Sequence, residues 1–198
     1  MKIKLELPEH IGDITLGQFQ DLELIDEDDR NYDRKKICIF TELEYNQLKG
    51  VSQKDYADIL KQIDKALELT PEFTNTFKIG EQEFGFIPNL DKISTGEFTD
   101  LSEWGVEIEN LHRIMAVLFR PITNTDPFNN YKIEDYNGTG QYAELMRQTP
   151  LHIVNGSLFF FRNLATDLEL SILRYTREAR LKALKLLTTS QSGVGTQR

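Results

Sequence analysis

The sequence is poor in the residues that build covalent cross-links or membrane-embedded structure. It has a single cysteine in 198 residues, so no disulfide can form within one chain. Cys38 lies in the apolar run Ile37–Phe40, which predicts a buried core side chain and not a nucleophile. No apolar stretch approaches the roughly 18 residues that suggest a membrane span. The first residues alternate polar and apolar, unlike a signal peptide. We therefore expect a soluble protein made in a cytoplasm, with no membrane partner.

Positive charge is also scarce, because 23 Lys and Arg stand against 32 Asp and Glu, a net charge of −9. Nucleic-acid binding needs clustered cations that neutralise phosphates. The balance therefore argues against direct sequence-specific nucleic-acid recognition. A local basic patch is compatible with this overall charge balance.

The motifs that carry catalysis are missing as well. Gly138–Gly140 lacks the rest of a phosphate-binding loop, and no Gly-x-Ser-x-Gly elbow is present. His10, His112 and His152 stand far apart in the chain. The acidic run Asp26–Asp29 lacks the turn glycine and distal glutamate of a calcium loop, so we interpret it as a solvated turn. We expect no catalytic residue, cofactor or metal, with an enzyme as a minor alternative.

What the sequence does contain is a succession of helical and strand patterns. Ile3, Leu5 and Leu7 alternate and predict an N-terminal strand. Thr15 with Gln18, and Ser52 with Asp55, have the spacing of helix N-caps. Helices are expected from about Thr15 to Ile25, from about Tyr32 to Leu48, and after Ser52, the last with a buried stripe of Tyr56, Ile59, Ile63 and Leu67.

Apolar residues on both sides of Gly80-Glu81 predict a β-hairpin. Because an isolated hairpin is marginally stable, we expect the N-terminal strand to join it in a three-stranded antiparallel sheet.

Two segments of the chain are similar to each other. Ile14–Glu23 and Ile93–Ser102 both place a hydroxyl residue before Gly, then an amide or acid, Phe, and Asp-Leu. Either an internal duplication or the ordinary chemistry of helix starts accounts for the likeness. The second segment predicts a helix capped by Ser94 or Thr95, with Phe98, Leu101 and Trp104 reaching the core.

The most apolar segment runs from Glu107 to Phe119 and predicts an enclosed central helix. We expect His112 to be a structural hydrogen-bonding residue in it, and Pro121 to end the helix. Residues 123–140 lack periodicity. They form either an exposed excursion or a contact surface for a protein partner, with three candidate anchors: Phe128, Tyr131 and Tyr136.

A heptad-like seam from Leu158 to Ala179 predicts a C-terminal helix from about Asn155 to Leu187, roughly 50 Å long. Its outer end is basic, with Arg174, Arg177, Arg180, Lys182 and Lys185. The helix dipole accounts for part of this bias. Docking of the helix on the acidic N-terminal region of a neighbouring subunit accounts for it as well. We expect one α+β domain over residues 1–187, mainly helical with a small antiparallel β-sheet and a protruding long C-terminal helix, and a flexible tail over 188–198.

Several short motifs recur in a known family. A hairpin ends in Phe86-Ile87-Pro88, a helix ends in Leu118-Phe119-Arg120-Pro121, and Gly156–Phe161 combines small residues with a run of Phe. In these features the stretch from Phe77 to Leu164 resembles virion and assembly proteins of tailed bacteriophages, the crAss-like group included. The stretch Thr15–Glu23 adds a weaker likeness.

That resemblance implies a tail-associated structural, ring or chaperone-like protein and supplies no catalytic residue. We expect a non-enzymatic phage structural protein in the virion, a homo-oligomeric, ring-like subunit of the tail or portal-proximal region that contacts portal, tail or neighbouring ring subunits. The alternative is an assembly chaperone that is absent from the mature particle, with a host-directed factor as a minor possibility.

Overall fold

The computed structural model describes residues 5–41, 43–68, 72–89, 92–104 and 107–160. Its contacts divide the chain into two units, Met1–Ser157 and Leu158–Arg198. Only residues 158–160 of the second unit are described, so the fold reported below is that of the first. It combines helices with a four-stranded antiparallel sheet, the α+β class that the sequence predicts. The expected C-terminal helix beyond residue 160 and the expected tail lie outside the described residues.

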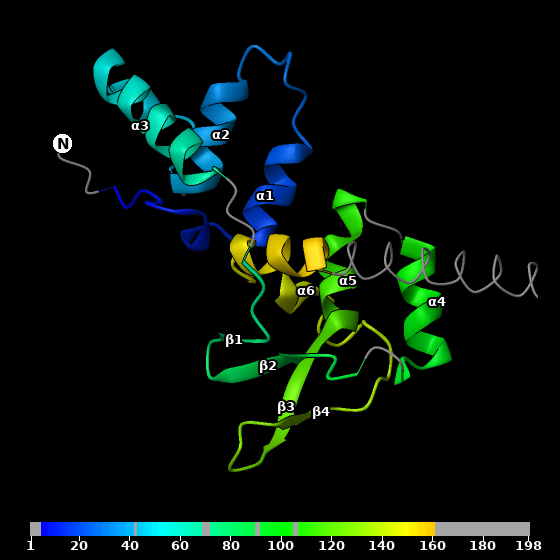
Figure 1. Ribbon diagram of the computed structural model, residues 1–198. Coiled ribbons are helices and arrows are strands. Elements are labelled where there is room, and N and C mark those ends of the chain that lie inside the picture. Colours follow the sequence, from blue (N-terminus) through cyan, green and yellow to red (C-terminus); the bar gives the residue numbers. More distant parts are fainter. Residues whose placement is uncertain (1–4, 42, 69–71, 90–91, 105–106, 161–198) are drawn as a thin grey trace, which may run out of the picture. The chain divides into compact units, whose positions relative to one another are not determined.

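Figure 1 labels the elements. The helices are α1 (Leu16–Glu23), α2 (Tyr32–Thr41), α3 (Gln53–Ala66), α4 (Thr95–Trp104), α5 (Leu111–Leu118) and α6 (Ala143–Met146). The strands are β1 (Thr76–Ile79), β2 (Gln82–Phe86), β3 (Phe119–Thr125) and β4 (Tyr131–Ile133). Short 3-10 turns cover Ile11–Asp13, Gln47–Gly50 and Ile108–Asn110, and residues 151–160 are helical.

The predicted hairpin is present, but its sheet partner is a different segment. Strands β1 and β2 turn at Gly80, whose φ of 57° favours glycine. β3 then pairs with β2, and β4 with β3, in the order β1-β2-β3-β4. Residues 5–8 form no strand, so the predicted contribution of Leu5 and Leu7 to the sheet is wrong. The chain that leaves α5 supplies the third strand instead.

Aromatic packing explains why β3 takes this place. Phe119, the first residue of β3, is fully buried and meets the ring of Phe77 edge-on at 4.9 Å and that of Phe86 at 5.2 Å between centroids. Phe77 also stacks on Phe84 at 5.7 Å. Each such pair adds about 0.5–1.5 kcal/mol beyond the area it buries. The Pro121 signal did mark the end of the helix, but the residues around it continue as strand.

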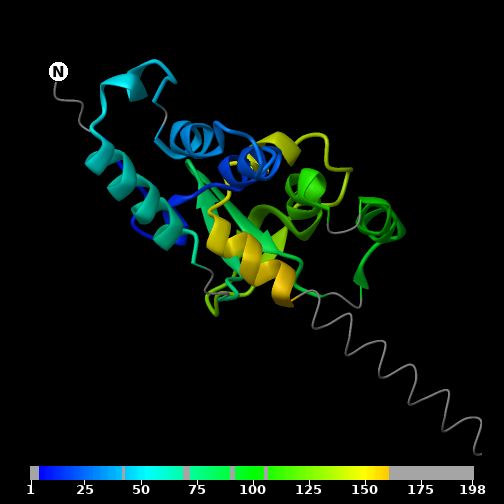
Figure 2. The same cartoon turned by 90° about the horizontal axis from the view of Figure 1, so that it is seen from above.

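Helix α5 is the central element, as the sequence predicts. Nearly every residue from Leu111 to Leu118 is buried, and the helix contacts α1, α4, α6 and β3. Figure 2 shows α5 between α1 and α4. Its start is later than expected, because the chain forms a 3-10 turn over Ile108–Asn110 first.

The N-terminal caps follow the sequence closely. Thr15 and Gln18 exchange hydrogen bonds of 3.2 and 3.0 Å at the start of α1, and the Ser52 hydroxyl accepts from the Asp55 amide at 3.1 Å before α3. Helix α3 buries Ile59, Ile63 and Ala66. Helix α2 ends at Thr41, several residues earlier than predicted, and its Cys38 is half-buried, with burial raising the pKa of the thiol.

Helix α4 presents an unexpected face to the core. Phe98 is 65% exposed and Leu101 and Trp104 are half-buried, whereas Glu97 is only 4% exposed. The prediction that the apolar residues of this helix reach the core is therefore wrong for Phe98. The cause is an ionic partner for Glu97 on β3, described below.

The two similar segments, Ile14–Glu23 and Ile93–Ser102, begin their helices with the same pattern of hydrogen bonds. In α4 the Ser94 hydroxyl accepts from the Glu97 amide at 3.2 Å and the Glu97 carboxylate accepts from the Ser94 amide at 2.6 Å, as Thr15 and Gln18 do in α1. Each helix then has a glycine and an aspartate one turn apart. A side chain from further along the chain lies against the glycine and bonds the aspartate. Arg147 does so at Gly17 and Asp21, and Tyr136 at Gly96 and Asp100.

Glycine at position 85 allows one aromatic ring to cross the sheet. A β-carbon there would lie 2.5 Å from the ring of Tyr131, whose hydroxyl donates to the Phe86 carbonyl at 2.9 Å. Tyr131 on β4 thus covers β2 from across β3, and this contact ties the outer strand to the hairpin.

We therefore predict that Gly85→Ala lowers the free energy of unfolding by about 1–3 kcal/mol, because the ring of Tyr131 must move. The measurement is urea denaturation of both single variants and of the double variant with Tyr131→Ala. In the Tyr131→Ala background the added methyl meets no ring, so its cost should shrink. Equal costs in both backgrounds would refute the assigned clash. Gly140→Ala is the control, because nothing lies within 4 Å of its would-be β-carbon.

Candidate protein interaction site

The turn between β3 and β4 presents one aromatic side chain to solvent. Phe128 is 85% exposed, the most exposed of the large apolar side chains within the described ranges. Asp126 organises the turn, since its carboxylate accepts from the Phe128 amide at 2.8 Å and from the Asn130 amide at 2.9 Å. Asn129 adopts a φ of 62°, a conformation that asparagine tolerates.

A third bond, from the Asn130 side-chain amide to the Asp126 carboxylate at 2.8 Å, completes the turn. These bonds, that from the Asn130 side chain foremost, hold the pKa of Asp126 below its ordinary value. The turn is therefore fixed by its own polar groups and needs no apolar contact from Phe128. An exposed phenylalanine on a turn that is already ordered can act as an anchor residue that enters a pocket on a partner protein.

The other two predicted anchors are engaged inside the chain. Tyr131 packs on the sheet as described, and Tyr136 donates a hydrogen bond to Asp100. Burial, and then the Asp100 carboxylate, raise the pKa of Tyr136 above its ordinary value. Both side chains are half-buried, and their hydroxyls bond to groups of this chain. Of the three, Phe128 has the exposure that an anchor needs.

The five basic candidates, Arg174, Arg177, Arg180, Lys182 and Lys185, lie outside the described residues.

Beneath Tyr136 lies a buried ion pair that the sequence analysis did not identify. Arg120 on β3 and Glu97 on α4 are 8% and 4% exposed and are joined by a direct hydrogen bond. The Arg120 guanidinium lies 5.4 Å from the centroid of the Tyr136 ring. Burial acts to raise the pKa of Glu97, but the hydrogen bonds from Ser94 and Arg120 outweigh it and hold the pKa below its ordinary value.

A second polar cluster joins α1 to α5. Gln20 is 2% exposed, and its amide nitrogen lies 2.6 Å from the Ile108 carbonyl and 3.1 Å from Nδ1 of His112. Its amide oxygen accepts from Arg147 at 3.3 Å, which fixes the orientation of the amide. With the amide in this orientation, Nδ1 of His112 is the acceptor, which corresponds to the tautomer with its proton on Nε2. The expectation of a structural hydrogen-bonding histidine is confirmed.

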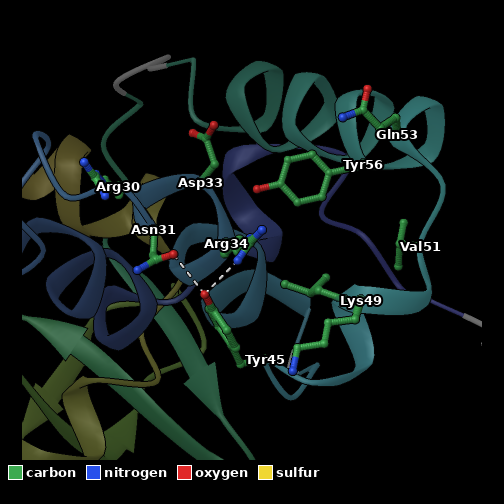
Figure 3. A pocket seen from close by; sticks show the side chains of 10 residues that line it. Arg30, Asn31, Asp33, Arg34, Tyr45, Lys49, Val51, Gln53 and Tyr56 are labelled. Atoms are coloured by element: carbon green, nitrogen blue, oxygen red, sulfur yellow. Dashed lines mark hydrogen bonds between the residues drawn. The ribbon is translucent and has the colours of Figure 1, made fainter.

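A polar cleft opens between the start of α2 and the segment that leads into α3 (Figure 3). Its volume is about 450 Å³. Three cations and one carboxylate line it together with two tyrosines, polar amides and two aliphatic residues: Arg30, Asn31, Asp33, Arg34, Tyr45, Leu48, Lys49, Val51, Gln53 and Tyr56.

Hydrogen bonds position the central cation of this cleft. Nη1 of Arg34 donates to the Tyr45 hydroxyl at 2.9 Å, and that hydroxyl donates to Oδ1 of Asn31 at 2.9 Å (Figure 3). The guanidinium also lies 5.6 Å from the centroid of the Tyr45 ring. The hydrogen bond with Tyr45 raises the pKa of Arg34, so its charge is permanent.

This cleft was not predicted from the sequence, where the acidic run Asp26–Asp29 was interpreted as a solvated turn. Arg30 and Arg34 follow that run directly and lie four residues apart, with Arg34 on α2 and Arg30 just before its first residue. These two neighbouring cations were the feature of the sequence that could have indicated the cleft. The approach of Tyr45 and Lys49 depends on the 3-10 turn that follows α2, which the periodicity did not predict.

No protein-family model matches the chain, and no curated protein or solved structure matches it either. Among the described residues no helix is both long and apolar enough to cross a membrane. The same part of the chain contains no cluster of His, Cys, Asp and Glu suited to a metal ion.

We predict that Glu97→Gln lowers the free energy of unfolding by about 3–5 kcal/mol, because it leaves the Arg120 charge buried without a counter-charge. Chemical denaturation measures the change. The control is Asp64→Asn, which breaks the 2.5 Å pair with Lys36, where the aspartate side chain is 61% exposed. The Lys36 side chain is 12% exposed, but its partner carboxylate is solvated, so we expect the pair to contribute about 1 kcal/mol or less. If the two substitutions had equal effects, Glu97 would be solvated in solution.

Acid should destabilise the protein through His112. Its pKa is lowered, first by burial and then by Arg113 and Arg147, against the opposing effect of Glu144. Protonation therefore favours the unfolded chain, and the free energy of unfolding falls as pH drops below the ordinary histidine pKa of about 6.5.

His112→Asn should reduce this pH dependence, because an amide oxygen near the position of Nδ1 still accepts from Gln20 and does not titrate. Urea denaturation between about pH 5 and 7.5 tests it. His152, whose pKa burial also lowers, retains part of the slope in the variant. An unchanged slope would show that His112 is not the titrating group.

Proposed function

We propose that this chain is a non-enzymatic structural protein of a tailed bacteriophage and acts through protein–protein contacts. In this proposal it is a repeated, ring-like subunit of the tail or portal-proximal region of the virion. Its partners are portal or tail proteins and neighbouring copies of itself. The phage setting comes from the resemblance carried by Phe86-Ile87-Pro88, Leu118–Pro121 and Gly156–Phe161.

The observation that supports a contact function is the ordered presentation of Phe128. Complete burial of a phenylalanine side chain stabilises a complex by about 1.5–3 kcal/mol. The three bonds to the Asp126 carboxylate order the turn before any partner arrives. Binding then loses little backbone entropy, so more of the burial energy appears as affinity.

Phe128→Ala should deplete the protein from assembled particles without unfolding it, because it removes the anchor and leaves the turn bonds intact. The measurement is quantitative mass spectrometry of purified particles from a phage-producing culture that expresses the chain. Thermal denaturation of the purified variant checks the fold. Phe98→Ala is the matched control, an exposed phenylalanine on another element, and it should leave incorporation unchanged.

Two results would contradict the proposal. Absence of the wild-type protein from particles would assign it to assembly alone, as a chaperone. Equal incorporation of Phe128→Ala and wild type would remove Phe128 as the anchor.

A further inference from the structure

The cations of the cleft have no ionic partner within the part of the chain that the structure describes. On the same stretch, Lys35 pairs with Asp29 at 2.6 Å and Lys36 with Asp64 at 2.5 Å. Arg30, Arg34 and Lys49 make no such pair there. In a chain with a net charge of −9, three unpaired cations around one cleft form a local site for an anion.

The guanidinium of Arg34, the central cation of the cleft, has N–H donors that can bind a carboxylate. Arg34 uses Nη1 for the Tyr45 hydroxyl and also interacts with Tyr56, and its other N–H donors are left for a ligand. A carboxylate is the group that matches a guanidinium with two parallel bonds. The half-buried Val51 adds an apolar part to the wall, with Leu48, only 7% exposed, behind it, so the favoured ligand combines acidic groups with an aliphatic side chain.

A long polyanion fits this site poorly. The run Asp26–Asp29 directly precedes Arg30, and Asp33 lines the cleft itself. Phosphates beyond the first few would lie against these carboxylates. A short segment with two carboxylates meets less of this repulsion, because it carries fewer negative charges than a polyanion and can end at the three cations.

The chain itself carries a segment of this chemistry. Leu24 is 66% exposed, and Glu27 and Asp28 are exposed beside it. Neither acid forms an ion pair within the described ranges, whereas Asp29 is engaged by Lys35. Asp26 closes the local turn by accepting from the Asp28 amide at 3.0 Å. An exposed aliphatic side chain followed by unpaired carboxylates complements the cleft.

We propose that the cleft around Arg34 binds the segment Leu24–Asp28 of a second copy of this chain. Glu27 and Asp28 meet the three cations, and Leu24 meets Val51. Each copy carries both the cleft and the segment, so the contact forms twice about a twofold axis or repeats head to tail in a ring. The inference deepens the proposed function, since it names the surface through which copies associate.

Charge reversal on each side tests the contact in the full-length protein. The cleft variant is Arg30→Glu with Lys49→Glu, which spares the bonded Arg34. The segment variant is Glu27→Lys with Asp28→Lys. Sedimentation equilibrium at low salt should show self-association of the wild type, and each variant alone should weaken it by on the order of tenfold or more, since one surface then repels the other. Circular dichroism checks that both variants fold.

A mixture of the two variants gives the decisive test of whether the cleft contacts the segment. The reversed cleft of one attracts the reversed segment of the other, and the unchanged cleft and segment also face each other. The mixture should therefore recover association that neither variant shows alone. Phe128→Ala leaves this contact intact and should associate as the wild type does, so loss of particle incorporation and loss of self-association are read separately.

A wild type that stays monomeric at low salt would overturn the proposal and leave the cleft to an acidic segment of another protein. Variants that associate as tightly as the wild type would overturn it as well. Association of the single variants with no gain on mixing would place the contact elsewhere.

Discussion

The ion pair between Glu97 and Arg120 determines how the helical and sheet parts of the described unit meet. Arg120 is the second residue of β3, so it is placed by the point at which α5 stops and the strand begins. Its charge draws Glu97 inward, and this sets the rotation of α4, which buries a carboxylate and exposes Phe98. Tyr136 then covers the guanidinium and bonds back to α4 through Asp100. One buried charge thus orders three segments that are distant in sequence.

The opposite flank of α5 uses neutral polar groups for a similar purpose. There Gln20 bridges α1 to the Ile108 carbonyl and to His112, and Arg147 bonds both Gln20 and Asp21. The apolar faces of α5 supply cohesion, while the polar pairs on its two flanks specify which helix lies where. The two similar segments, α1 and α4, both dock by a glycine that admits a side chain and an aspartate that bonds it.

The sequence predicted the features that depend on neighbouring residues. Caps at Thr15 and Ser52, the turn at Gly80 and the buried α5 all follow from local chemistry or periodicity. It did not predict β3, because Phe119-Arg120-Pro121 looks like a helix end and its pairing with β2 comes from the distant rings of Phe77 and Phe86. The exposure of Phe98 was missed for the same kind of reason, since the residue that decides it lies on another element. Of the three anchor candidates, aromatic character alone could not separate Phe128 from tyrosines with internal partners.

The cleft around Arg34 differs from the rest of the unit in how it is built. All its lining residues lie between Arg30 and Tyr56, one continuous stretch of chain. Its formation therefore closes only short loops, whereas the sheet joins segments many residues apart. Local opening of the β3–β4 hairpin would leave the cleft standing, because regions of a protein open with separate free energies. The residues that form the cleft therefore belong to one stretch of the chain, and the β3–β4 turn that carries Phe128 belongs to another. A change in one of these two surfaces can leave the other intact.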